Sequence, residues 1–204
     1  MVNLAAPKTF QFIEYVLDQK TFTQYRAAKE LHLTMPLINQ ATNYLLKRGF
    51  IAHDGKQYNL RDAAGLIASI HLFRDMKDLQ LLEIHTSLEK EKAMASLQAT
   101  TAAPIYCLDT ALNNYSNWWR SNLVCAYVEP QALDEIHMTF LYHPGNATVL
   151  RVFKEKPKVE KFFEARGQRF TAKTRTVIDM VCDKQLNAVE PLFRQLWGRD
   201  VANP

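Results

Sequence analysis

The sequence predicts a mixed α/β protein of the α+β class with two domains, and three observations lead to this prediction. Residues 23–60 hold two short helical patterns and a hairpin signal. From Leu81 onward helix and strand signals alternate, which is typical of a sheet packed against helices. With 204 residues, 48% of them hydrophobic, the chain can bury two small cores. We expect the first domain to span 1–61, a connecting helix 62–80 and the second domain 81–204.

The first domain is expected to begin with two helices. An opening helix is predicted over Lys8–Gln19, where apolar side chains recur on one face, namely Phe12, Ile13, Val16 and Leu17. Thr23 can cap a second helix, Gln24–Leu33, by accepting a hydrogen bond from its first turn. The residues from His32 to Thr34 would then form the turn of a helix-turn-helix.

A third helix is predicted over Met35–Arg48. Thr34 is its expected N-cap, and Pro36 falls in the first turn, where a missing backbone N–H is harmless. Gly49 follows at a position that tolerates a left-handed backbone, so the helix should end there. Apolar residues at helical spacing predict one buried stripe, formed by Ile38, Ala41 and Leu45.

The opposite face of this helix carries side chains that suit a nucleic acid. It is expected to present Pro36, Asn39, Gln40, Asn43 and Lys47. A side-chain amide offers a donor and an acceptor together, which matches the edge of adenine in the major groove. Lys47 and Arg48 lie in the last turn, where they complement the negative end of the helix dipole and can equally reach phosphates.

Two strand-like stretches follow, Phe50–Ala52 and Gln57–Leu60, on either side of Asp54-Gly55. An Asp-Gly pair between two strands is a hairpin signal. A hairpin directly after such a helix is a wing, so the first third of the chain resembles the winged-helix family of DNA-binding proteins. The alternative is a three-helix core that binds no ligand.

The resemblance implies that Met35–Arg48 enters the major groove and that the wing, around His53–Tyr58, lies along the DNA backbone or in the minor groove. The three amides Asn39, Gln40 and Asn43 would read bases, and the other residues would position the duplex. The candidate DNA-binding residues are Thr23, Gln24, Tyr25, Thr34, Pro36, Asn39, Gln40, Asn43, Lys47, Arg48, Lys56 and Tyr58.

Charge is distributed unevenly along the chain, although the total is only +4. Lys and Arg outnumber Asp and Glu by 7 to 4 in residues 1–60, are outnumbered by 10 to 6 in 61–150, and outnumber them by 12 to 7 in 151–204. This pattern lets the first segment face a polyanion without the whole surface doing so. A basic surface is also common in proteins that do not bind nucleic acid, so charge alone decides little.

The run Arg151–Arg175 holds nine basic residues against three acidic ones. It is either a second nucleic-acid surface that neutralises phosphates, or a solvated face, or a site for an acidic partner. A nucleic-acid surface here would use Lys154, Lys156, Lys158, Lys161, Arg166, Arg169, Lys173 and Arg175.

A helix predicted over Arg61–Leu79 connects the two domains, with Asp62 as its cap. Its apolar stripe is longer than a small three-helix core can cover. The stripe contains Leu66, Ile67, Ile70, Phe73 and Met76. The helix is either the seam of a homodimer or a linker buried within one chain, and the sequence leaves both open.

The second domain is predicted from strands and helices in alternation. The expected strands are Leu81–Ser87, Leu123–Val128, Thr139–His143 and Ala147–Phe153. The expected helices are Leu88–Leu97, which Ser87 would cap, Ala103–Tyr115, Gln131–Met138, Thr171–Asp183 and Leu186–Trp197. The charged segment Glu155–Phe163 is expected at the periphery.

Three stretches carry a further resemblance. They are YCLDTALNNY at 106–115, LVCAYV at 123–128 and RFTAKTRTVIDMVCD at 169–183. Through them the second domain resembles the C-terminal domain of AbiEi-type antitoxins, a degenerate relative of the nucleotidyltransferase fold that follows a winged helix. The resemblance implies a DNA-binding autoregulator of its own operon that counters a partner toxin.

Catalytic residues are not expected in this domain. An active nucleotidyltransferase needs a Gly-Ser turn and then two carboxylates that clamp metal ions. The corresponding stretch, SNWWRSNLVCAYVEP, lacks the Gly and has Cys125, Ala126 and Tyr127 on the strand. Asp134 and His137 fall short of the three protein ligands of a catalytic zinc site. We therefore expect no enzymatic activity, no cofactor and no metal.

The remaining features predict a cytoplasmic protein. No apolar run is long enough to cross a bilayer, and the N-terminal residues lack the basic start and apolar centre of a secretory signal. Cys107, Cys125 and Cys182 are widely spaced in apolar surroundings, which is typical of buried thiols. Of Trp118 and Trp119, we expect one to pack and the other to be exposed at an interface.

The sequence thus predicts a homodimeric transcription regulator that binds double-stranded DNA. A toxin would be a further partner under the antitoxin resemblance. An alternative of another class uses the winged helix as a protein-interaction module, with the C-terminal domain binding a partner protein or a nucleotide. No contact with a membrane is expected.

Overall fold

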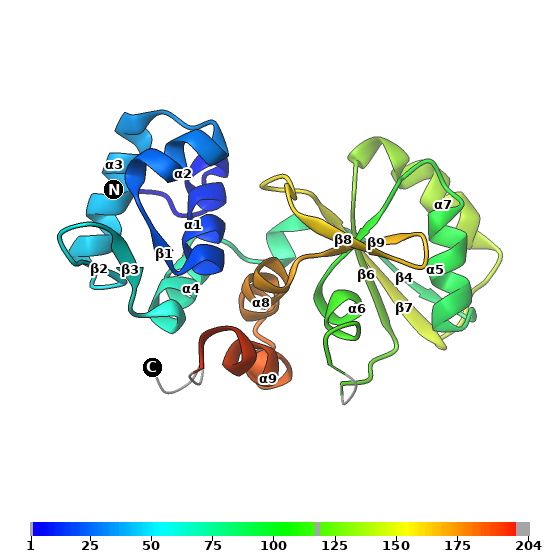
Figure 1. The fold of residues 1–204 in the computed structure, drawn as a ribbon. Helices are drawn as coiled ribbons and strands as arrows, with labels where there is room; N and C mark the ends of the chain where they lie inside the picture. The colour runs from blue at the N-terminus through cyan, green and yellow to red at the C-terminus, as the bar shows by residue number, and fades with distance from the viewer. Residues whose placement is uncertain (1, 117–118, 199–204) are drawn as a thin grey trace. The chain divides into compact units, whose positions relative to one another are not determined.

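The computed structural model describes residues 2–116 and 119–198, and it is a mixed α/β structure (Figure 1). The chain divides into two compact units. The first unit contains residues up to Arg74 together with the chain from Phe193 onward, and the second contains Asp75–Leu192. The expected division at 61 and 80 therefore differs from this one in two places, because the connecting helix and the end of the last helix both belong to the first unit.

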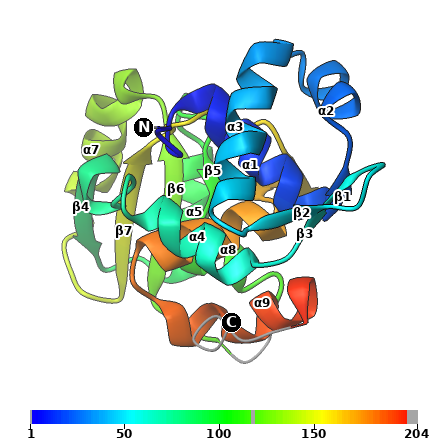
Figure 2. The ribbon, with the colours of Figure 1, turned by 90° about the vertical axis from the view of Figure 1, so that its left-hand side faces the viewer.

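The first unit combines helices with a small antiparallel sheet. The helices are α1 (Pro7–Gln19), α2 (Gln24–Leu31), α3 (Met35–Lys47) and α4 (Ala63–His71). The strands are β1 (Thr21–Phe22), β2 (Ile51–His53) and β3 (Tyr58–Leu60), in the order β1-β3-β2. The β2–β3 hairpin follows directly on α3 and lies beside its end in both ribbon views (Figures 1 and 2).

The core of the first unit is built on α1. Its predicted apolar face is confirmed, because Phe12, Ile13, Val16 and Leu17 are all buried. The ring of Phe22, on β1, packs edge-on against Phe12 at a centroid distance of 5.5 Å. Strand β1 was not predicted, because two residues are too short to show a periodic pattern.

Helix ends in this unit follow from backbone conformation. α2 ends at Leu31, earlier than predicted, because His32 adopts a left-handed conformation with φ 52° and donates its N–H to the carbonyl of Ala28. α3 ends at Lys47, and Gly49 has φ +73°, as the predicted glycine stop requires.

The connecting helix is shorter than predicted. It covers Ala63–His71 instead of Arg61–Leu79, and a separate turn of 3₁₀ helix, η1 (Lys77–Leu79), follows. Asp62 does cap α4, accepting from the backbone N–H of Gly65 at 2.7 Å. Its stripe residues Leu66, Ile67 and Ile70 are fully buried, which agrees with the linker alternative, whereas Phe73 is half-buried.

The second unit is built on a six-stranded mixed sheet in the order β4-β7-β6-β5-β9-β8. The pairs β6–β7 and β5–β9 are parallel, and the other pairs are antiparallel. α5 and α7 lie on one face of the sheet and α6 and α8 on the other (Figure 1). The elements are β4 (Gln80–Thr86), α5 (Lys90–Gln98), β5 (Ile105–Tyr106), α6 (Leu108–Leu112), β6 (Leu123–Val128), η2 (Pro130–Ala132), α7 (Leu133–Leu141), β7 (Thr148–Lys154), β8 (Phe162–Ala165), β9 (Gln168–Thr171), α8 (Lys173–Cys182) and the first part of α9 (Leu186–Trp197).

The strand predicted over Leu123–Val128 is confirmed with the same bounds, and five of its six residues are buried. The strand predicted over Thr139–His143 was wrong. Those residues continue α7 to Leu141, because Ile136 and Phe140 lie one helical turn apart and both are buried.

Two other predictions in this unit are corrected. Ile105 and Tyr106 were assigned to a helix but form strand β5, which pairs with β6 and β9. Ser87 does not cap α5, whose N-cap is Glu89. The charged segment Glu155–Phe163 ends in β8, an edge strand of the sheet, which agrees with its predicted peripheral position.

Cys107, Cys125 and Cys182 are all buried, as predicted, and none of the three is in a disulfide. Within the described part of the chain, no helix has the length and apolar character to span a membrane.

Candidate nucleic-acid interface

Helix α3 has the predicted buried and exposed faces. Ile38, Ala41 and Leu45 are buried, and Thr42 joins them. Thr34 is the N-cap residue with an extended backbone, as predicted, and its side chain makes no capping hydrogen bond. The residues predicted for the opposite face are all exposed, namely Pro36, Asn39, Gln40, Asn43 and Lys47.

Three side-chain amides meet on the exposed face. Asn39 Oδ1 accepts hydrogen bonds from Gln24 Nε2 at 3.3 Å and from Asn43 Nδ2 at 3.2 Å. Because the Asn39 oxygen faces two donors, its own NH₂ group points elsewhere and can donate to another molecule. The network also connects the first turn of α2 to α3, so it fixes the amides relative to both helices.

Helix α2 supplies the residues beside this network. Thr23 Oγ1 accepts from the backbone N–H of Arg26 at 3.2 Å, which confirms Thr23 as the N-cap. Tyr25, in the first turn, is 73% exposed. Arg26 pairs with Glu30 at 2.7 Å, so its charge is already partly balanced.

Met35 is a candidate that the sequence reading missed. It is 44% exposed at the start of α3, one turn before Asn39 on the same face. An apolar side chain there suits the methyl group of thymine. The signal available in the sequence was its position directly after the predicted cap.

The β2–β3 hairpin is held by Asp54. Its Oδ1 accepts from the backbone N–H groups of Lys56 (3.0 Å) and Gln57 (2.9 Å), and its Oδ2 accepts from Asn59 Nδ2 (3.0 Å). These hydrogen bonds, with that from Gln57 the strongest, lower the pKa of Asp54 to about 2. The turn thereby presents the exposed side chain of Lys56.

Tyr58 has a packing role that the sequence did not indicate. Its ring stacks on Phe22 at a centroid distance of 5.3 Å and lies 4.6 Å from the ring of His53. The side chain is only half-buried, so it supports the hairpin and still reaches the surface. At the end of α3, Lys47 is exposed, and the guanidinium of Arg48 lies 5.6 Å from the ring of Tyr44.

The basic run Arg151–Arg175 is not one continuous surface. Arg175 is 1% exposed and pairs with Asp179 at 3.1 Å, so it cannot neutralise a phosphate of an external strand. Arg151 pairs with Asp183 at 3.1 Å. The other residues named for a second nucleic-acid surface are exposed or half-buried.

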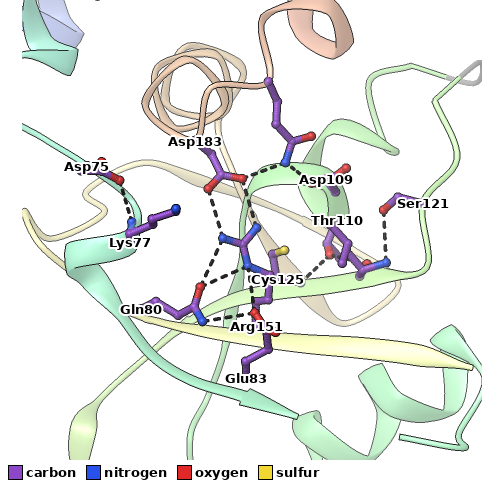
Figure 3. A network of polar contacts seen from close by, with 12 residues as sticks. Asp75, Lys77, Gln80, Glu83, Asp109, Thr110, Ser121, Cys125, Arg151 and Asp183 are labelled. Atoms are coloured by element: carbon purple, nitrogen blue, oxygen red, sulfur yellow. Dashed lines mark hydrogen bonds and ion pairs between the residues drawn. The ribbon is translucent and has the colours of Figure 1, made fainter. Parts of the chain in front are cut away.

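A second polar cluster lies in the second unit, around Arg151 (Figure 3). Its guanidinium donates to both oxygens of Asp183 at 3.1 Å and to Gln80 Oε1 at 3.2 and 3.3 Å. Although burial opposes it, the hydrogen bonds and charge of Asp183 raise the pKa of Arg151. Burial raises the pKa of the nearby Cys125 thiol, which keeps it protonated.

The residues at the possible nucleotidyltransferase and zinc positions do not form a catalytic group. Cys125, Ala126 and Tyr127 are buried in β6. Asp134 and His137 are exposed on α7. Among the described residues, no group of three or more His, Cys, Asp or Glu side chains could hold a metal ion.

Comparisons of the chain with models of protein families, with curated proteins and with solved structures gave no match. The function therefore has to be inferred from the residues and their geometry.

Of the two tryptophans, Trp119 is half-buried, and Trp118 lies outside the described residues.

Proposed function

We propose that the chain is a sequence-specific DNA-binding transcription regulator and that its first unit is a winged helix. The observation that carries this proposal is a linked set of side-chain amides: exposed Asn39 and Asn43 on α3, and half-buried Gln24 on α2. An α-helix of this kind fits the major groove, where amides can pair with adenine.

The geometry of the amides supports base reading over mere solubility. Side chains that are already oriented lose less conformational entropy when they bind. In the network Asn39 is held by two donors while its NH₂ group remains available. Exposed Gln40 lies next to it and offers a further donor and acceptor.

The surroundings of α3 supply contacts to the DNA backbone. Lys47 and Arg48 lie at the end of α3, and Lys56 lies on the turn of the hairpin. Positive side chains flanking a recognition helix position the duplex without reading its sequence. The β2–β3 hairpin would act as the wing.

The test is fluorescence anisotropy with a duplex from the region upstream of the protein's own gene and with a scrambled duplex. Asn39→Ala should weaken binding to the first duplex by about 1–3 kcal/mol and leave the scrambled duplex unchanged. Lys47→Ala should weaken both alike and reduce the slope of log K against log salt by about one.

Two variants outside this face serve as controls. Gln98 and Lys92 are exposed on α5, so Gln98→Ala and Lys92→Ala should bind both duplexes as the unaltered protein does. Equal losses on both duplexes for Asn39→Ala and Lys47→Ala would contradict the division between base-reading and backbone-positioning residues. If the unaltered protein bound neither duplex, the proposal that it is a DNA-binding regulator would be contradicted.

The finer part of the proposal is an autoregulatory antitoxin. It is supported by the resemblance of the second unit to AbiEi-type antitoxins. Co-purification of the chain with the product of the adjacent gene tests this part separately from DNA binding.

A further inference from the structure

The second unit contains an open pocket of about 650 Å³. It lies between the start of α5, the segment that precedes β6 and the turn that joins β8 to β9. Its volume falls in the range of small-molecule sites, roughly 300–1,000 Å³. None of the residues assigned to DNA contacts lines it.

The lining of the pocket is cationic. Lys90, Arg120 and Arg166 face a single acidic residue, Glu91. Arg120 and Arg166 are exposed and form no ion pair with a described residue. Their charges are therefore available to an anionic ligand.

Lys90 is the most enclosed of the three cations. Its Nζ donates to the carbonyl of Ser121 at 3.1 Å. The amide of Asn113 satisfies its neighbours when its oxygen accepts from Nζ of Lys90, at 2.6 Å, and its nitrogen donates to the carbonyl of Trp119. Both hydrogen-bond partners are uncharged, and burial lowers the pKa of Lys90 although the charges of Asp109 and Glu91 act in the opposite direction. A bound anion would replace the solvation that the ammonium group has lost.

The same pocket holds an aromatic wall and an unused hydroxyl. Trp119 lines it, and its indole N–H donates to Asp109 at 2.6 Å, which fixes the ring. Ser116 also lines the pocket, and its Oγ is buried without a hydrogen-bond partner among the described residues. A fixed indole ring favours stacking with a flat group, and a buried hydroxyl requires a partner.

We propose that this pocket binds a small anion in which a planar ring carries a phosphate or carboxylate group. The ring would stack on Trp119, and the anionic group would be held by Lys90, Arg120 and Arg166. This site is separate from the proposed DNA-binding face, so the ligand would be a regulatory one.

The experiment is isothermal titration of the full chain with phenyl phosphate, benzoate, inorganic phosphate and phenol. The two ring-bearing anions should bind more tightly than phosphate or phenol, because only they use both the cations and the ring. The more tightly bound of the two identifies the anionic group. Equal affinity for phosphate and phenyl phosphate would overturn the role of Trp119, and absence of binding by every probe would overturn the site.

Arg166→Gln is the decisive variant. Arg166 is exposed on the β8–β9 turn, and its side chain makes no ion pair or hydrogen bond with another described residue that the substitution would remove. Loss of one charge-assisted hydrogen bond should raise Kd by about tenfold or more. Arg120→Gln should do the same. Lys92→Gln removes an exposed charge on α5 outside the pocket and should leave Kd unchanged.

Unchanged binding by both arginine variants would show attachment elsewhere on the chain and overturn the proposal. The titration contains no DNA. Its failure is therefore distinct from a failure of the proposed DNA binding.

Discussion

Arg175 is a buried arginine, and arginine side chains are rarely buried unless they are paired. It is 1% exposed, and Asp179, its partner one helical turn away at 3.1 Å, is fully buried. Tyr127 on β6 donates its hydroxyl to Asp179 at 2.7 Å, and Arg175 also donates to the carbonyl of Pro157 at 3.1 Å. The charged pair thus fixes α8 to the sheet.

Arg175→Met should lower the free energy of unfolding by about 3–5 kcal/mol, because it leaves the carboxylate of Asp179 buried without its counter-ion. The double variant Arg175→Met with Asp179→Leu removes both charges and should recover most of that loss. Urea unfolding of the full chain, followed by circular dichroism, measures both.

Lys154→Met is the control, because Lys154 is exposed at the end of β7. It should change stability by no more than about 0.5 kcal/mol. A double variant as unstable as Arg175→Met would mean that lost packing, and not the stranded charge, causes the effect.

At the scale of elements, the β2–β3 hairpin depends on one carboxylate. Folding lowers the pKa of Asp54 from 3.8 to about 2 through hydrogen bonds from Gln57, Lys56 and Asn59. The ionised form therefore stabilises the hairpin at all pH values above the unfolded pKa of 3.8. That contribution is lost as the pH falls through the folded pKa of about 2.

An NMR titration of the Asp54 carboxyl carbon should give a midpoint near 2. Asn59→Ala removes one of the donors and should move the midpoint upward, toward 3.8. Gln98→Ala, which replaces an exposed amide of α5 outside this turn, is the control and should leave the Asp54 midpoint near 2. A midpoint at 3.8 in the unaltered chain would show that the hairpin is not held in this way.

Elements with a strong local pattern could be predicted from the sequence. α1, α3 and α9 show helical spacing of apolar residues over twelve or thirteen positions, and β6 is a continuous apolar run. The exposed face of α3 could also be predicted from the sequence, because a buried stripe leaves only the opposite face of a helix to solvent. The hydrogen bonds among the amides could not be predicted, because they depend on how α2 crosses α3.

Elements defined by partners distant in sequence could not be predicted. β5 is a two-residue strand that exists because β6 and β9 lie on either side of it. The segment Thr139–His143 has the composition of a strand, yet Phe140 is buried as the next turn of α7. In both cases tertiary packing overrides local propensity.

At the scale of the whole molecule, hydrogen bonds connect the pocket to the start of the second unit. Trp119, at the pocket, is linked to Gln80, which lies shortly after the unit boundary at Arg74. The links pass in order through Asp109, Gln185, Asp183 and Arg151, at distances of 2.6–3.3 Å. A second contact, Lys184 to Asp75 at 3.7 Å, reaches the first residue of the second unit. Such a contiguous network gives a ligand in the pocket a physical route to the segment that follows the boundary between the two units.

If the pocket is regulatory, phenyl phosphate at saturation should change the Kd for the specific duplex by a factor in the usual range of allosteric coupling, about 5–150. By linkage, saturating duplex must change the Kd for phenyl phosphate by the same factor. Gln185→Ala interrupts the network between Asp109 and Asp183 without removing a residue of the pocket, so it should preserve both affinities measured alone and bring the coupling factor close to one. Gln98→Ala, an exposed amide of α5, is the matched control and should keep the full factor. A factor that survives Gln185→Ala would place the coupling outside this network, because the variant removes both hydrogen bonds by which Gln185 joins the pocket side to Arg151.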